Sequence, residues 1–91
     1  MGAIHVDRAV HADVLNRLAA LCAADNLPLE PRIEAAAMVA RAVHGSVENQ
    51  EAALDVLKVA MKDGTPAQIL RAAEILLEFK PTTGAPRAGY R

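Results

Sequence analysis

The chain repeats one pattern twice: an apolar helix-forming stretch, a turn, a proline and a second helix-forming stretch. The first copy covers residues 15–43 and the second covers residues 54–79. Pro28 in the first copy corresponds to Pro66 in the second, and apolar residues precede both. The matched apolar positions are Leu15, Leu18, Leu21 and Cys22 in the first copy and Leu54, Leu57, Ala60 and Met61 in the second. A helical hairpin repeated at this period is typical of modules that stack or dock, which favours binding over chemistry.

Length and composition restrict the fold further. A chain of 91 residues forms one domain. Apolar residues make up 53% of it, but many of these are alanine and only Phe79 and Tyr90 are aromatic. Alanine is the best helix former and lets helix backbones approach closely. We therefore expect an all-α domain over residues 1–80, built from four helices in two consecutive hairpins, with a flexible tail over residues 81–91.

Helix boundaries can be placed from caps and prolines. The spacing of apolar residues predicts helices over residues 7–24, 31–44, 46–62 and 65–79. Ser46 is suited to cap the third helix. The fourth has the clearest start, because Thr65 is a capping residue, Pro66 suits the first helical position and Gln68 completes a capping box. Pro81 requires that helix to end before it.

The later helices have wide apolar faces. At about 100° per residue, the apolar side chains of the third and fourth helices each cover roughly 220°. One interpretation is that alanine accounts for the excess; the other, which we favour, is a surface for self-association or for a partner. Large side chains at the margins of these arcs are the best candidates for that surface. The predicted interface residues are Val59, Leu70, Ile75 and Phe79.

Residues suited to catalysis or metal binding are few. Ser46 is the only serine, and Cys22 is the only cysteine, which rules out a disulfide within the chain and suggests a packing role. His11 lies on the apolar side of the first helix with Asp7 four residues before it. Such a pair can contribute to a metal or catalytic site, but a structural role is the more common one, and we favour it. We therefore expect no catalytic residue, metal or cofactor, and a protein that is not an enzyme.

Charge and hydropathy bear on partners and location. The net charge is −1, with acids and bases interspersed, so no strong field attracts nucleic acid or an acidic membrane. DNA binding stays open as an alternative. The residues that would contribute to it are Lys58, Lys62, Arg71, Lys80, Arg87 and Arg91. No apolar run approaches the ~20 residues of a membrane span, and the N-terminus does not read as a signal peptide. The expected location is the cytoplasm.

The segment 66–78, in which a proline is followed by Arg-Ala-Ala and Leu-Leu, resembles two groups of known sequences. It is similar to the second helix of HEAT-like hairpins, which implies either a HEAT-like pair or a compact bundle. It also resembles a helical segment of small phage-encoded proteins, including small terminase subunits. Those subunits form rings and recognise DNA without a catalytic site of their own. This resemblance implies a homo-oligomer and a phage origin.

The sequence therefore predicts a non-enzymatic interaction module whose partner is itself, another protein, or both. Self-association through the apolar faces of the third and fourth helices is the leading hypothesis. One alternative is a DNA-binding component of a phage packaging or regulatory complex. Another is a small inhibitor or adaptor that docks on a host protein.

Overall fold

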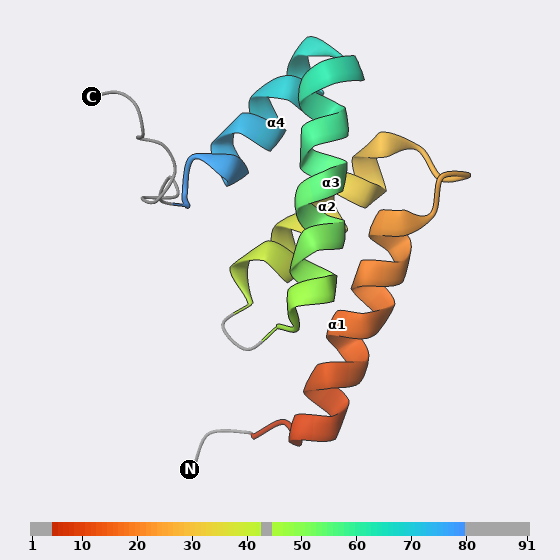
Figure 1. Ribbon diagram of the computed structural model, residues 1–91, viewed down its shortest axis with the longest axis vertical. Helices are drawn as coiled ribbons and strands as arrows, with labels where there is room; N and C mark the ends of the chain where they lie inside the picture. Colours follow the sequence, from red (N-terminus) through yellow and green to blue (C-terminus); the bar gives the residue numbers. More distant parts are fainter. Residues whose placement is uncertain (1–4, 43–44, 80–91) are drawn as a thin grey trace, which may run out of the picture.

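A computed structural model describes residues 5–42 and 45–79 of the chain, and within them it confirms the expected all-α fold. Four helices follow one another in these residues (Figure 1): α1 (Arg8–Ala23), α2 (Leu29–Arg41), α3 (Val47–Asp63) and α4 (Pro66–Leu76). The expected tail over residues 81–91 lies outside the described residues. The first and third predicted helices agree with α1 and α3 to within one residue at each end.

The other two helices differ from their predicted ranges. α2 begins at Leu29, two residues before Pro31, because a proline anywhere in the first turn removes only an N–H that would be unpaired. α4 ends at Leu76, earlier than the predicted 79. The amide of Glu78 donates to the carbonyl of Ile75, and that of Phe79 donates to the carbonyl of Leu76. Each of these bonds spans three residues, whereas an α-helical bond spans four, so the helix closes with a 3₁₀-type turn.

Side-chain caps fix the beginnings of three helices. Ser46 accepts a hydrogen bond from the amide of Asn49 at 3.1 Å, as expected for the cap of α3. At α4, Thr65 Oγ1 accepts from the Gln68 amide at 3.2 Å, and Gln68 Oε1 accepts from the Thr65 amide at 3.0 Å. This confirms the predicted capping box. Asp7 caps α1 with a longer bond of 3.3 Å to the amide of Ala9.

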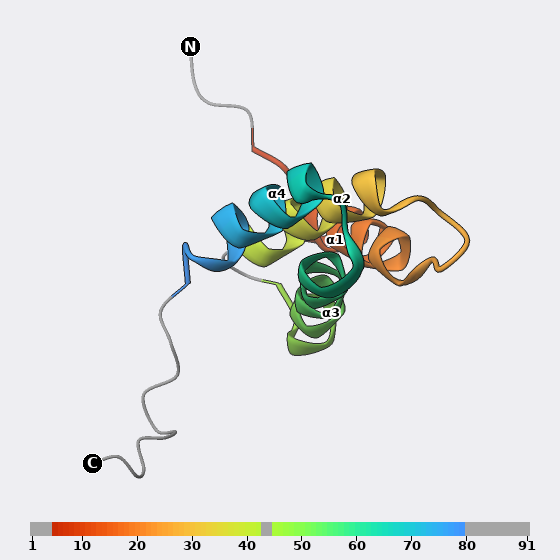
Figure 2. The same cartoon turned by 90° about the horizontal axis from the view of Figure 1, so that it is seen from above.

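The helices are arranged around a central pair. α2 and α3 pack against each other, α1 and α4 both contact this pair, and in the described residues α1 and α4 do not touch. Figure 1 shows α1 and α4 on opposite sides of the pair, and Figure 2 shows α3 on one side of the other three helices. α1 and α4 are therefore the outer helices of the fold.

Half of the core consists of alanine. Its larger side chains include Leu15, Cys22, Ile33, Val39, Val56, Leu57 and Ile75, and its alanines are Ala35, Ala36, Ala37, Ala40, Ala53, Ala60 and Ala72. Small side chains let the helix axes approach closely, which explains how a chain with few large aromatic residues forms a closed core. α2 contributes the most, with buried residues on nearly every side except the one that carries Glu34, Met38 and Arg41.

Candidate interaction surfaces

The four residues predicted to form an interface do not lie together. Leu70 is 71% exposed, whereas Ile75 is 0% exposed and belongs to the core. Val59 lies beside a hollow that Cys22, Asp25 and Arg32 also line. Phe79 lines a different hollow at the end of α4. That hollow is formed with Ala40, Arg41, Ala42, Gln50, Leu54 and Glu78.

The prediction for Ile75 was wrong, and the reason is geometric. The apolar arc of α4 is wide enough to have two margins, and the helix buries the margin that contains Ile75 and Ala72 against its neighbours. The opposite margin, with Leu70, stays exposed. The width of an apolar arc indicates that part of it stays uncovered, but the direction of burial depends on where the other helices lie.

A stripe of apolar side chains runs along the exposed side of α4. Leu77, which directly follows the helix, is 84% exposed and was missed in the predicted interface. It lies seven residues after Leu70, so the two side chains project from the same side of the helix. Partly buried Ala73 lies between them. Leu70, Ala73 and Leu77 are called the α4 stripe below.

A second stripe runs along α1 and was also missed. It consists of Val10, Val14 and Leu21, of which Val10 is the most exposed at 52%. The buried residues of α1 are Leu15, Ala19 and Cys22, so this helix buries a narrow side and leaves another apolar side open. The sequence signal was present, because these three residues belong to the apolar pattern that predicted the helix. These residues are called the α1 stripe below.

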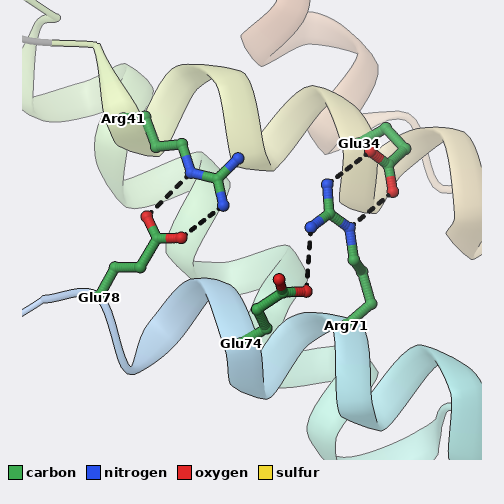
Figure 3. A network of polar contacts seen from close by, with 5 residues as sticks. All are labelled: Glu34, Arg41, Arg71, Glu74 and Glu78. Atoms are coloured by element: carbon green, nitrogen blue, oxygen red, sulfur yellow. Dashed lines mark hydrogen bonds and ion pairs between the residues drawn. The ribbon is translucent and has the colours of Figure 1, made fainter.

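The seam between α2 and α4 is polar at the surface (Figure 3). Arg71 donates to both carboxylate oxygens of Glu34, at 3.0 and 2.9 Å, and to Glu74 at 3.2 Å. Arg41 binds both oxygens of Glu78, with its Nε at 2.9 Å from Oε1. Paired, two-pronged contacts of this kind fix the relative position of two helices better than single ion pairs do.

These ion pairs shift the ionisation of their members. The hydrogen bond from Arg71 lowers the pKa of Glu34, and the hydrogen bond from Arg41 lowers the pKa of Glu78. The same bonds raise the pKa of both guanidinium groups. Both carboxylates are therefore ionised at neutral pH, and the two arginines are already engaged with them.

Three of the residues predicted for nucleic-acid contact lie in the described part of the chain, and these three do not gather into a basic surface. Lys58 and Lys62 are exposed on the polar side of α3, where acidic residues are interspersed with them. Those acids include Glu51, Asp55 and Asp63. Arg71 is held in the ion pairs between α2 and α4. Lys80, Arg87 and Arg91 lie outside the described residues.

The remaining reactive side chains were placed in part as expected. Cys22 is fully buried, and its Sγ lies 3.9 Å from the carbonyl oxygen of Arg32. Burial raises the pKa of the Cys22 thiol, against the opposing influence of Arg32. His11, by contrast, is exposed, because it lies in the first two turns of α1, which include no buried side chain. Within residues 5–42 and 45–79, histidine, cysteine and acidic side chains form no group of three that could hold a metal ion.

No family model, curated protein or solved structure matches this chain. The resemblance of residues 66–78 to HEAT-like hairpins and to small terminase subunits therefore stays a prediction. None of the helices in the described part of the chain has the length and apolar character needed to span a membrane.

Proposed function

We propose that this protein is a non-enzymatic interaction module that associates with a second copy of itself. The observation that supports this proposal is that both outer helices are apolar on two sides. On one side α1 and α4 pack against the α2–α3 pair, and on the other they carry the α1 stripe and the α4 stripe. An outer helix of an isolated domain needs apolar side chains only on the side that packs on its neighbours, so a second, exposed apolar stripe favours a partner.

The packing of α1 supports the same proposal. Residues Arg8–Val14, the first two turns, include no buried side chain, although the helix is continuous through them. Figure 1 shows this end of α1 projecting beyond the neighbouring ends of α2 and α3. Helical segments of two turns are marginal in water without tertiary contacts. Contact with another molecule would supply the packing that the fold itself does not.

Oligomeric state tests this function directly. We would measure the mass of the wild-type protein by light scattering on size-exclusion eluate, from low micromolar to near millimolar concentration. The expected result is a rise from the monomer mass of 9.6 kDa towards a defined oligomer. The monomer mass at every concentration would contradict self-association. The two stripes would then be surfaces for a different protein, as in the inhibitor or adaptor hypothesis.

A variant of the α4 stripe shows how much of the association depends on that side of the molecule. Leu77→Glu changes a side chain that is 84% exposed, so it leaves the fold intact. Lys58→Glu on the polar side of α3 is the matched control, because it also adds an acid to an exposed position. Circular dichroism should be unchanged in both variants.

The proposed setting for this module is the cytoplasm.

A further inference from the structure

The α1 stripe has a defined direction on the molecule. At about 100° per residue, Val10, Val14 and Leu21 lie within about 40° of one another on the helix. Asn16 is about 120° to 160° away from them, and its side chain accepts a hydrogen bond of 2.8 Å from Asn49 of α3. The stripe therefore points away from α3. It is open along its length, because each of its three residues is at least 42% exposed.

One flank of the α1 stripe carries an ordered pair of opposite charges. Arg17 Nε donates to Asp13 Oδ2 at 2.9 Å, one helical turn apart. Both side chains are well exposed, Arg17 by 80% and Asp13 by 60%. This pair is centred on residue 15. The apolar residues it flanks extend from Val10 to Leu21, so they are centred at nearly the same height on the helix.

Because the charge pair and the α1 stripe are centred at nearly the same height, two copies of α1 match each other in one direction but not in the other. When two identical helices pack antiparallel about a two-fold axis, the same flank of each faces the other, in reversed order. With the axis at the height of Leu15, Asp13 of one copy lies opposite Arg17 of the other, and the reverse holds for the second pair. The four charges then alternate in sign, and Val10 of one copy lies opposite the end of the α1 stripe that carries Leu21 in the other copy.

A parallel pair does not have this match. There, the flank with Asp13 and Arg17 would face the other flank of the second helix, which carries Asp7, His11 and Leu18. That flank has no lysine or arginine level with Asp13 and no acid level with Arg17, so the charges would not alternate. Charge complementarity therefore selects the antiparallel arrangement of two copies.

We propose that a second copy of this chain covers the α1 stripe, with the two α1 helices antiparallel about a two-fold axis near Leu15. This inference rests on the proposed function, because it names the surface through which the module associates. The contact supplies tertiary packing to residues Arg8–Val14, the part of α1 that has no buried side chain within its own chain.

Disulfide cross-linking between two variants tests the direction of the helices. One variant carries Val10→Cys and the other Leu21→Cys, and they are oxidised separately and as an equal mixture. In the antiparallel pair, residues 10 and 21 of different copies come within the distance a disulfide can bridge. The mixture should therefore form mixed disulfides, and each variant alone should form few. Wild type gives the background, because its one cysteine, Cys22, is fully buried.

Charge reversal tests the flank independently. Arg17→Asp places acids opposite acids across the two-fold axis, so it should raise the dimer dissociation constant by about tenfold or more. The double variant Asp13→Arg/Arg17→Asp restores the alternation and should return the constant to near the wild-type value. Reversal of Lys58, on the polar side of α3, is the control. Circular dichroism of each variant at low concentration confirms that the monomer is folded.

The outcomes separate this inference from the proposed function. Wild type that stays monomeric at every concentration overturns both. If the wild type forms an oligomer, but the mixed cysteine variants form no mixed disulfide and the single and double charge variants change the dissociation constant equally, the antiparallel α1 contact alone is overturned. Disulfides formed within each variant but not between them would indicate a parallel pair, which also overturns it.

Discussion

The two outer helices, α1 and α4, pack on the same central pair but are attached to it in different ways. α4 has only 11 residues, yet it has a complete capping box, two buried side chains and ion pairs to α2 from Arg71 at its middle and from Glu78 just after its end. α1 has 16 residues, of which only Leu15, Ala19 and Cys22 are buried. The position of α4 is therefore fixed by its own chain, whereas the first half of α1 lacks such contacts. This difference indicates where a partner would change the molecule most.

The largest expected effect comes from the side chain that anchors α4. Ile75→Ala removes a fully buried side chain and leaves a cavity, so we expect the free energy of unfolding to fall by about 2–5 kcal/mol. Val10→Ala in α1 should change it by less than about 0.5 kcal/mol in the monomer, because Val10 is half exposed. Urea unfolding at low protein concentration measures both. Similar losses in the two variants would contradict the difference between the helices.

The turn that leads into α4 gives the next largest effect. A Cβ atom at Gly64 would lie 2.5 Å from the carbonyl oxygen of Ala60, a backbone atom that cannot move aside easily. Gly64→Ala should therefore destabilise the fold by about 1–3 kcal/mol through overpacking. Gly45→Ala is the matched control, since the nearest atom to its added Cβ would be 3.6 Å away. Equal thermal stability of the two variants would count against a tight α3–α4 turn.

Much of the fold could be predicted from the sequence because helix starts depend on neighbouring residues. The caps at Ser46 and Thr65 were identified from residue type and spacing alone, and both form the expected hydrogen bonds. The beginning of α2 was misplaced because its first residue, Leu29, has no capping side chain before it. The end of α4 was misplaced because Leu77 and Phe79 continue the apolar pattern after the hydrogen bonding has changed.

The candidate surface could be predicted only in part. The sequence shows that the apolar face of α4 is wider than a helix at the surface of a domain needs, and Leu70 is exposed as expected. It does not show which margin of the arc faces α3, so Ile75 was assigned to the surface and Leu77 was not. The α1 stripe was missed for a related reason. In the sequence, all the apolar residues of α1 fit one buried face. The positions of α2 and α3 show that part of this face is buried and that the part with the α1 stripe is exposed.

Loss of a helix cap should affect the two outer helices differently. Thr65→Ala removes one hydrogen bond of the capping box of α4, whose first turn already includes the partly buried Gln68 and Ile69, so it should cost about 1 kcal/mol of global stability. Asp7→Ala removes the cap of α1, where the first turns are unpacked, so the effect should be local fraying. In the Asp7→Ala variant, hydrogen exchange should become faster only for the amides in the first turn of α1. Equal global losses would mean that the start of α1 is packed.

The smallest effect concerns the ion pairs of Arg71 with Glu34 and of Arg41 with Glu78, because their side chains are between 33% and 54% exposed and solvent screens them. The pKa values of Glu34 and Glu78 are lowered in the folded protein by Arg71 and Arg41. Their stabilising contribution is therefore complete above the unfolded value of about 4.3, and it is lost as the pH falls through the lower folded values.

The double variant Glu34→Gln/Glu78→Gln should melt below wild type at neutral pH, and the two melting temperatures should converge as the pH falls below about 4. Glu51→Gln, at an exposed position of α3, is the control. Added salt should narrow the same gap at neutral pH, because exposed ion pairs are screened. A gap that stayed constant with pH would mean that the two carboxylates act by packing and not by charge. The attachment of α4 would then depend on Ile75 and the capping box alone, and its contrast with α1 would be one of burial only.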